Sequence, residues 1–385
     1  MITLRGITWN HSRGYVSVVA AAQRFCELNP EIEIVWEKRS LKAFGDAPVG
    51  ELAARYDLMV IDHPWAGYAV RNKIVLPLEQ YLDQDYLEDQ RAGSVGQSFE
   101  SYCFDGCQSA LPIDAAAPVA AYRESWFERA GEEVPGTWEQ VLALAKRGHV
   151  TCAGDPTNVL MQFYMFGNTL TATLFAEGAD QVISEADGRM VLEIMREFAA
   201  HCPEEMYRLD PIGVYELLAG DGPCVYTPFE FGYSNYSRRG YAAHTVISTG
   251  VVSMEGKPLQ TVLGGTGLAV SRACVHRQQA LKFAAFVASP QIQTTLYFES
   301  GGQPGHRTAW LDSEVNRMSS NFFAGTIDTL DRAYLRPRYD GYLYFQDRAG
   351  TVLRDYLRED KEAGQVLEQL NQLYRESKGW EDRQL

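Results

Sequence analysis

Hydrophobic and polar positions along the first part of the chain follow two periods. Alternation over 2–7 and 31–36 predicts two strands, and apolar residues at helical spacing over 15–26 predict a helix that ends before Pro30. The continuous apolar run 56–61 is typical of a strand buried on both faces. Strands and helices that alternate in this way predict an α/β fold with a parallel sheet and right-handed crossovers.

Polar and aromatic residues follow two of these predicted strands. Because ligands of such sheets bind beyond the carboxyl ends of the strands, we expect the loops 8–15 and 62–68 to share one edge. The candidate ligand contacts in these loops are Trp9, Asn10, His11, Arg13, Asp62, His63 and Trp65. Core anchoring by the two tryptophans and a turn cap formed by Asp62 are the ordinary alternatives.

From residue 137 onward the pattern is mainly helical. Thr137 and Gln140 predict a capping box at a helix start. The other predicted elements are a helix at 187–201, a short strand at 223–226 that opens into the loop 227–233, a strand at 268–270, a helix that stops at 289–290, and helices in the tail after 353.

Length, composition and charge narrow the functional class. At 385 residues the chain exceeds what one hydrophobic core usually organises, which predicts two lobes. The net charge of −15 argues against nucleic acid and anionic membrane surfaces as partners, and no apolar run of about 18 residues is present to span a membrane. The opening segment predicts a strand rather than an export signal, so an exported chain and a cytoplasmic protein are both open alternatives.

The cysteine content indicates a mainly reduced chain. Seven cysteines are an odd number, so at least one thiol is unpaired within the chain. Cys103 and Cys107 flank Phe104-Asp105-Gly106. A two-residue turn at Asp105-Gly106 places the two thiols on opposite faces, and only a three-residue loop sets them opposite one another. A disulfide between them is therefore the less favoured alternative, and no metal-type spacing accompanies them.

Three blocks, in this order along the chain, resemble the extracellular solute-binding proteins of bacterial sugar ABC transporters. They are Tyr56-Asp57-Leu58 to Ile61-Asp62 with Leu76-Pro77-Leu78 and Tyr81-Leu82; Leu111-Pro112-Ile113-Asp114 to Thr137-Trp138-Glu139; and Gly267-Leu268-Ala269-Val270-Ser271 to Ser289-Pro290 with Gly301-Gly302-Gln303-Pro304. Each block alone is moderately specific, but their order and spacing cover nearly the whole chain.

The resemblance implies a periplasmic-binding-protein-like α/β fold of two hinged lobes, each a mostly parallel sheet flanked by helices. Lobe one is expected at 1–113 plus 266–320 and lobe two at 114–265 plus 321–385, with three crossings near 112–117, 260–266 and 320. It further implies a monomeric, periplasmic protein without a cofactor or metal. Such a protein binds a small sugar-like solute between its lobes and delivers it to an ABC permease.

The resemblance also indicates further candidate ligand contacts. A sugar offers hydroxyl groups and apolar C–H faces, so its receptor supplies planar polar groups and flat aromatic rings. The candidates are Asp114 at the first crossing, Tyr226, Phe229 and Glu230 on the aromatic wall of lobe two, Gly265 and Thr266 at the second crossing, and Arg307 after Gly301-Gly302-Gln303-Pro304. The alternatives are a packed aromatic loop, a glycine hinge and a surface salt bridge at Arg307.

Two other functional classes stay open as alternatives. His11, Arg13, His63 and Arg307 are more basic than a neutral sugar requires, which suggests a binding or sensor protein for a sugar acid or another small anion. The chain lacks the elbow, zinc and phosphate-loop motifs of common enzymes. A glycosidase with Asp62 and Asp114 as its carboxylate pair is the weaker alternative, because carboxylate pairs follow no spacing rule.

Overall fold

A computed structural model of the protein describes residues 1–46, 49–171, 174–176 and 178–379. The chain folds as two compact units. Unit 1 comprises 1–116, 263–327 and 335–340, and unit 2 comprises 117–262, 328–334 and 341–385. The chain therefore passes between the units near 116, 262 and 327, and returns briefly to unit 1 over 335–340.

Unit 1 is built on a mixed sheet. Its strands, in spatial order, are β2 (Ile32–Arg39), β1 (Ile2–Trp9), β3 (Leu58–Asp62), β12 (Gly264–Val270) and β6 (Leu111–Ala116). β1 pairs in parallel with both β2 and β3, whereas β12 is antiparallel to β3 and β6. The shared edge predicted for the loops after β1 and β3 is confirmed, because these neighbouring strands run in the same direction.

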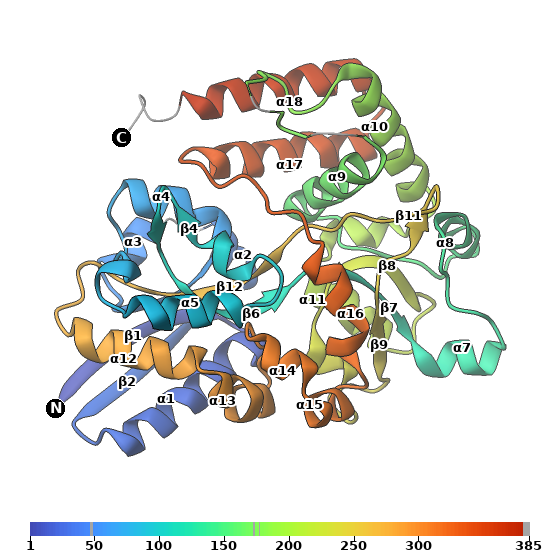
Figure 1. The fold of residues 1–385 in the computed structure, drawn as a ribbon. Coiled ribbons are helices and arrows are strands. Elements are labelled where there is room, and N and C mark those ends of the chain that lie inside the picture. The colour runs from blue at the N-terminus through green and yellow to red at the C-terminus, as the bar shows by residue number, and fades with distance from the viewer. Residues whose placement is uncertain (47–48, 172–173, 177, 380–385) are drawn as a thin grey trace. The chain divides into compact units, whose positions relative to one another are not determined.

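Helices cover both faces of this sheet (Figure 1). They are α1 (Ser17–Leu28), α2 (Leu41–Asp46), α3 (Val49–Ala53), α4 (Ala66–Arg71), α5 (Gln84–Ala92), α6 (Ser98–Ser101), α12 (Arg277–Ala288), α13 (Pro290–Ile292), α14 (Arg307–Leu311) and α15 (Ser313–Met318). Phe25 of α1 packs edge-on against Phe283 of α12, with ring centroids 5.3 Å apart, and both belong to the core beneath Trp36. The apolar residues of α1 and α12, which recur at helical spacing, thus cover one face of the sheet.

The cysteine hairpin forms with the predicted two-residue turn. β4 (Cys103–Phe104) pairs with β5 (Cys107–Gln108), and Phe104 lies opposite Cys107. Asp105 and Gly106 have φ of +49° and +76°, as a tight hairpin turn requires. Cys103 and Cys107 are both free thiols in this structure.

Unit 2 combines a small sheet with longer helices. Its strands are β8 (Tyr226–Phe231), β7 (Pro118–Arg123) and β9 (Val246–Thr249) in that order, beside the ribbon β10 (Ser253–Met254) and β11 (Lys257–Pro258). β7 is antiparallel to both neighbours, so the expectation of a mostly parallel sheet holds for unit 1 and is wrong for unit 2. Hydrophobic periodicity defines which faces of a strand are buried but carries no information about strand direction.

The predicted strand at 223–226 is also displaced. The strand β8 covers Tyr226–Phe231, so most of the segment expected to be a loop is the strand itself. Every residue from Tyr226 to Glu230 is buried. A strand buried on both faces shows no alternation, and its aromatic and proline content resembles that of a loop.

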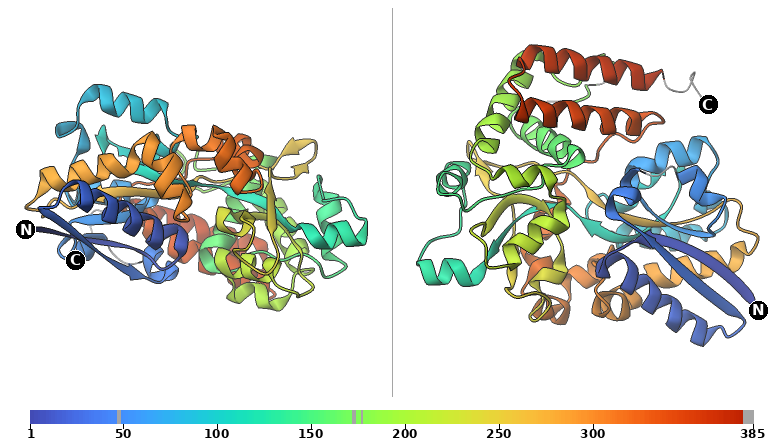
Figure 2. Two further views of the ribbon diagram at one scale, coloured as in Figure 1. Left: turned by 90° about the horizontal axis from the view of Figure 1, so that it is seen from below. Right: turned by 180° about the vertical axis from the view of Figure 1, so that it is seen from behind.

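The helices of unit 2 follow the predicted periodicity closely. They are α7 (Glu124–Ala130), α8 (Trp138–Ala145), α9 (Pro156–Leu170), α10 (Glu185–Ala199), α11 (Pro211–Ala219), α17 (Tyr342–Arg358) and α18 (Ala363–Lys378); α16 (Phe322–Asp331) begins in unit 1 and ends in unit 2. The predicted capping box at Thr137 and Gln140 is present. Helices α17 and α18 run side by side, as Figure 1 and the right view of Figure 2 show.

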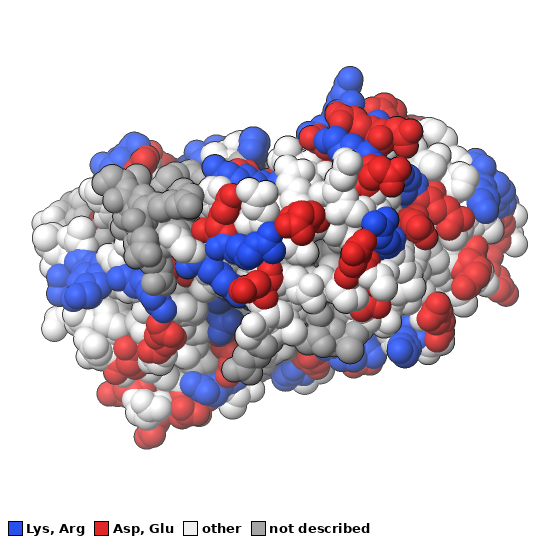
Figure 3. All heavy atoms as spheres, turned by 90° about the horizontal axis from the view of Figure 1, so that it is seen from above, with Lys and Arg blue, Asp and Glu red and all other residues white. Residues whose placement is uncertain are grey.

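Acidic and basic side chains are interspersed over the face drawn in Figure 3, which shows no large area of one sign. The net charge of −15 therefore is not gathered into a single patch on this face. Among the described residues, none of the helices has the length and apolarity needed to cross a membrane.

Candidate functional site

Three candidate residues of unit 1 lie next to one another on neighbouring strands. Thr266 of β12 pairs with Asp62 at the end of β3 on one side and with Asp114 of β6 on the other. The β12–β6 register shifts directly after Thr266, which marks an irregularity at this position. Thr266 is 5% exposed, and within the described residues its hydroxyl has no hydrogen-bond partner. A buried hydroxyl of this kind calls for an explanation such as a bound ligand or water.

Arg13 and Asp114 form a buried ion pair at this edge. The Arg13 Nε donates to Asp114 Oδ2 at 2.7 Å and an Nη donates to Oδ1 at 2.5 Å, which is the bidentate geometry that arginine favours. Their side chains are 5% and 0% exposed. Burial raises the pKa of Asp114, and the guanidinium partly opposes this effect. Both residues are predicted ligand contacts, and in the structure they contact one another.

Asp62 has a different environment. Its carboxylate accepts a hydrogen bond from the His63 backbone N–H at 2.8 Å and lies 3.3 Å from an Nη of Arg336. Burial acts to raise the pKa of Asp62, but Arg336 and His63 outweigh it and hold the pKa at about 2. The side chain keeps 26% exposure. Asp62 is therefore an ionised and partly accessible hydrogen-bond acceptor.

Both histidines of this edge are neutral near pH 7. His63 is fully buried, and desolvation with the nearby Arg336 lowers its pKa to about 4. Burial and the adjacent Arg13 likewise lower the pKa of His11 to about 4. His11 Nδ1 accepts a hydrogen bond from the Arg13 backbone N–H at 3.1 Å and so caps the turn after β1.

The two candidate tryptophans pack within unit 1. Trp9 is 3% exposed and lies 5.2 Å from Phe44 by ring centroids, and a side chain at Gly14 would collide with its indole. The Trp9 Nε1 has no hydrogen-bond partner among the described residues. Trp65 is 7% exposed and packs edge-on against Tyr68. Flat stacking of a ligand is thus unsupported at Trp9, whose faces already pack on protein atoms.

Three further candidates of unit 1 have distinct positions. Asn10 is exposed, and its backbone N–H donates to the Arg39 carbonyl. Gly265 has φ of +106°, and an added Cβ would lie 2.4 Å from the carbonyl oxygen of Asp114, so only glycine fits there. Arg307 begins α14, where its Nε donates to the Ser94 carbonyl at 3.4 Å.

The candidates of unit 2 lie on β8. Tyr226 is fully buried, and burial raises its pKa; among the described residues its hydroxyl has no partner. Phe229 is stacked on Trp138, with ring centroids 6.1 Å apart, and contacts Phe166 and Phe198 in the same aromatic cluster. These contacts favour the packed-core alternative for most of the Phe229 ring.

Glu230 is the candidate with the most unusual environment. It is 2% exposed, and its carboxyl accepts hydrogen bonds from the backbone N–H groups of Ala153 at 2.9 Å and Phe231 at 3.1 Å. Desolvation raises its pKa to about 8, although both N–H groups act in the opposite direction. At neutral pH Glu230 is therefore mostly a neutral acid that can donate as well as accept.

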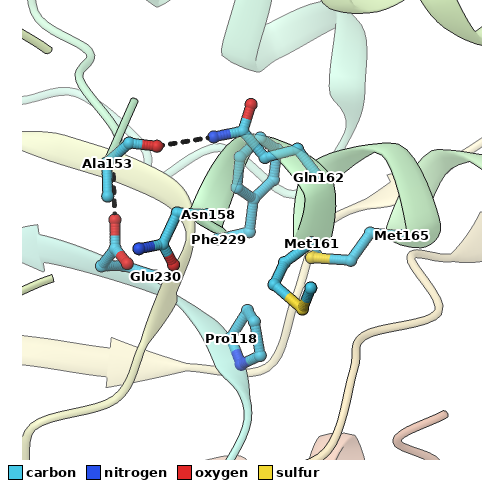
Figure 4. A pocket seen from close by; sticks show the side chains of 8 residues that line it. All are labelled: Pro118, Ala153, Asn158, Met161, Gln162, Met165, Phe229 and Glu230. Carbon is cyan, nitrogen blue, oxygen red and sulfur yellow. Dashed lines mark hydrogen bonds between the residues drawn. The ribbon is translucent and has the colours of Figure 1, made fainter. Parts of the chain in front are cut away.

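Glu230 lines a pocket within unit 2 (Figure 4). The pocket has an empty volume of about 200 Å³ that includes open solvent, and it is lined by Pro118, Ala153, Asn158, Met161, Gln162, Met165, Phe229 and Glu230. The Gln162 amide donates to the Ala153 carbonyl at 2.8 Å, so Ala153 is fixed from both sides. Methionine, phenylalanine and amide groups line the pocket, whose enclosed space is about that of one water molecule.

Sequence reasoning missed several of these groups. Arg336 returns to unit 1 from the far end of the chain to pair with Asp62, and no local pattern indicates such a contact. Tyr102 is fully buried and donates to the Ile61 carbonyl at 3.1 Å and the Gly265 carbonyl at 3.4 Å. One usable signal lies in α9. There Asn158, Gln162 and the two methionines form a polar and sulfur-rich stripe at helical spacing.

Within the part of the chain that the structure describes, no three metal-ligating side chains come together. Unit 1 instead gathers an acceptor carboxylate, a hydroxyl and neutral histidines at the carboxyl edge of an α/β sheet. These groups lie in a chain that folds as two α/β units.

The bacterial extracellular solute-binding protein family matches residues 8–294, and the chain belongs to that family. The family consists of solute-binding proteins, in agreement with the predicted class. No curated protein matched the sequence.

Solved structures of ABC transporter solute-binding proteins share the fold. A ribitol complex from Agrobacterium radiobacter K84 aligns with a TM-score of 0.83 at 20% identity over 97% of this chain and 98% of that one. An α-D-tagatose complex from Thermotoga lettingae TMO aligns with a TM-score of 0.82 at 15% identity, over 98% of this chain and 100% of that one. Maltose-bound MalE3 of T. maritima aligns with a TM-score of 0.81 at 16% identity, over 99% of this chain and 100% of that one. The predicted fold class is thereby confirmed.

Proposed function

We propose that this protein is the substrate-binding component of an ABC importer and binds a small, uncharged carbohydrate or polyol. Membership of the extracellular solute-binding family supports the general role. Relatives of the same fold carry ribitol, tagatose or maltose, which supports polyhydroxylated ligands as the class. The proposed partner is the membrane permease of the importer, and the proposed location is the periplasm.

The observation that carries this proposal is the charge balance at the carboxyl edge of unit 1. Asp62 is ionised but matched by Arg336, Arg13 is matched by Asp114, and His63 is neutral. Arg13 and Arg336 therefore each face a carboxylate of the chain itself, and the edge offers hydrogen-bonding groups in fixed directions. Hydroxyl groups satisfy such a surface, because each can donate to the carboxylate and accept from a neighbouring donor.

The same balance disfavours the alternative of an acidic ligand. That alternative was based on His11, Arg13, His63 and Arg307. Both histidines have pKa values of about 4, and the guanidinium of Arg13 is held by a buried carboxylate. A carboxylate ligand placed here would have to displace Asp114 from Arg13, which costs more than a surface ion pair returns.

The ligand class is tested by calorimetric titration with ribitol, tagatose, maltose and the sugar acids gluconate and galacturonate. We expect at least one neutral compound to bind and to raise the melting temperature, because it binds only the folded chain. Binding of the acids alone, at every ionic strength, would contradict the proposal.

The site in unit 1 is tested with Asp62→Asn and Thr266→Val, with Asp85→Asn on the exposed face of α5 as a matched control. We expect Asp62→Asn to weaken binding about tenfold or more, since a hydrogen bond to a charged group contributes about 1.5–3 kcal/mol. Thr266→Val should weaken binding about fivefold, since a neutral hydrogen bond contributes about 1 kcal/mol. The control should bind like the wild type. Far-ultraviolet circular dichroism verifies folding, and equal affinity in all three variants would exclude this edge as the site.

We further propose that groups from both units contact the solute, so that binding favours a closed arrangement about the passages between the units. Solution scattering with and without the calorimetrically identified sugar tests this step. A smaller radius of gyration in the bound state is expected. Light scattering on the same samples should give a monomer near 43 kDa.

A further inference from the structure

One short segment near the end of the chain belongs to unit 1, although the chain on both sides of it belongs to unit 2. We call this segment, Leu335–Asp340, the strap. Its six residues lie in neither a helix nor a strand. Side-chain contacts therefore matter for where the strap lies on unit 1.

Two side chains anchor the strap to unit 1. An Nη of Arg338 donates to the Cys103 carbonyl at 2.9 Å and to the Glu100 carbonyl at 3.3 Å. Asp340 is 6% exposed and accepts a hydrogen bond from the Asn72 amide at 3.3 Å. The guanidinium of Arg338 thus joins the strap to α6 and β4, while Asp340 joins it to the end of α4.

The backbone of unit 1 leaves room for the strap at one glycine. Gly67 lies in α4, and a Cβ added there would collide with the carbonyl oxygen of Arg338. The two backbones approach so closely that only glycine fits. Pro337 in addition favours an extended backbone at Arg336. Close packing and proline together restrict where Arg336 can lie.

Arg336 makes the contact between the strap and the candidate site. Its side chain is 3% exposed, and one Nη lies 3.3 Å from both Oδ1 and Oδ2 of Asp62. A nitrogen at equal distance from both oxygens faces the carboxylate between them and so restrains its orientation. The His63 backbone N–H holds Oδ1 at 2.8 Å.

We propose that the strap fixes the Asp62 carboxylate in the orientation in which it accepts hydroxyl groups of the solute, with Arg336 as the positioning residue. The inference rests on the proposed function of the protein and on the role of Asp62 in it. Without Arg336, the carboxylate would lose the cation that compensates its partial removal from water. It would then turn toward solvent or bind a proton, and in either case it would be a poorer acceptor.

A double-mutant cycle, measured by calorimetric titration with ribitol, tagatose and maltose near neutral pH, tests whether Arg336 acts through Asp62. Arg336→Met should weaken binding about tenfold, because the hydrogen bond to a positioned carboxylate is lost. In the Asp62→Asn background the same substitution should weaken binding no further. Arg332→Met, at an exposed arginine just before the strap, is the matched control and should bind like the wild type. Equal losses in both backgrounds would overturn the proposal.

Gly67→Ala moves the strap without changing Asp62 or Arg336. It should reproduce the loss of affinity seen in Arg336→Met, whereas Gly50→Ala, where the added Cβ meets only ordinary contacts, should not. Far-ultraviolet circular dichroism verifies that both variants are folded. Wild-type affinity in a folded Gly67→Ala protein would contradict the role of the strap.

A pH profile of binding separates positioning from general destabilisation. Burial acts to raise the pKa of Asp62, but Arg336 and His63 hold the pKa at about 2. Tyr102 and Asp114 are the other titratable groups near it, and they are common to all the proteins compared. Loss of Arg336 should raise the pKa of Asp62, so Arg336→Met should lose affinity at a higher pH than the wild type as the pH falls. Arg336→Lys, which keeps a cation, should return the profile toward that of the wild type, and identical profiles in all three proteins would refute the positioning role.

Hydrogen exchange read by mass spectrometry tests the strap without any sugar. Peptides that cover 335–340 should exchange faster in Arg336→Met than in the wild type or in Arg332→Met. Unchanged exchange would overturn the proposal. If none of the three sugars binds the wild type while exchange of the strap is faster in Arg336→Met, the proposed ligand class is wrong and the attachment of the strap through Arg336 is supported.

Discussion

Replacing Glu230 by glutamine tests the most unusual electrostatic feature of unit 2. The folded protein keeps the Glu230 proton up to about pH 8, because the carboxyl group is desolvated. Glutamine resembles the neutral acid in shape but cannot ionise. It also places an NH₂ group where one of the N–H donors of Ala153 and Phe231 now points, so a constant cost of about 1–3 kcal/mol is expected at every pH.

The sign and size of the pH effect follow from the two pKa values of Glu230. In the unfolded chain the group loses its proton near its ordinary value of 4.5, whereas in the folded protein it does so near 8. Its contribution to stability is therefore fully present below pH 4.5 and is lost as the pH rises through 8. Between pH 5 and pH 8 the wild type should lose about 3.5 kcal/mol from this group, at about 1.4 kcal/mol per pKa unit.

The measurement is urea unfolding of the wild type and Glu230→Gln at pH 5, 6.5 and 8, followed by tryptophan fluorescence. Other groups titrate too, so the informative quantity is the difference between the two proteins at each pH. We expect the wild type to be the more stable at pH 5 and its advantage to vanish or reverse by pH 8. Glu205→Gln, at an exposed position of the same unit, should track the wild type throughout. A difference that is constant with pH would refute the raised pKa.

Three further substitutions test individual features of the fold. Asp114→Asn leaves the Arg13 guanidinium buried without its carboxylate and should cost about 3–5 kcal/mol in urea unfolding, while Arg13→Met combined with Asp114→Leu should recover most of it. Gly265→Ala should sharply lower the melting temperature, because of its φ of +106° and the 2.4 Å approach to a carbonyl oxygen; Gly222→Ala, with open surroundings, should not. Thr137→Ala removes the cap of α8 and should lower the free energy of unfolding by about 1 kcal/mol.

The elements of unit 1 could be predicted from sequence because local pattern and tertiary environment agree there. The run 58–61 is uniformly apolar, and β3 is buried along its length except at Asp62, where it reaches the edge. The first helix ends at Leu28, directly before the Asn29-Pro30 signal. The hairpin at Cys103 has the register that a two-residue Asp-Gly turn gives, which is one of the two loop lengths that the sequence left open.

The strands of unit 2 were harder to predict from sequence, because the contacts that determine their pairing are not local. β8 is buried from Tyr226 to Glu230, and Phe229 packs against aromatic residues of α8, α9 and α10, so the sequence of the strand shows neither alternation nor an aliphatic run. Its pairing with β7 joins residues about a hundred positions apart, and the antiparallel direction follows from that packing. Periodicity locates elements, but which strand pairs with which depends on the long-range burial of aromatic rings.

For the candidate site, sequence reasoning placed candidate residues of unit 1 at one edge of its sheet but could not assign roles among them. Arg13 and Asp114 were both predicted to contact ligand, yet they contact each other, because each buried charge requires a partner. Asp62 resembles Asp114 in sequence, but Arg336 approaches it from only one side and leaves it 26% exposed. The carboxylate that remains accessible is the one able to accept a ligand hydroxyl. Since Thr266 lies beside Asp62 in register, with a hydroxyl that lacks a partner among the described residues, these two positions carry the binding prediction.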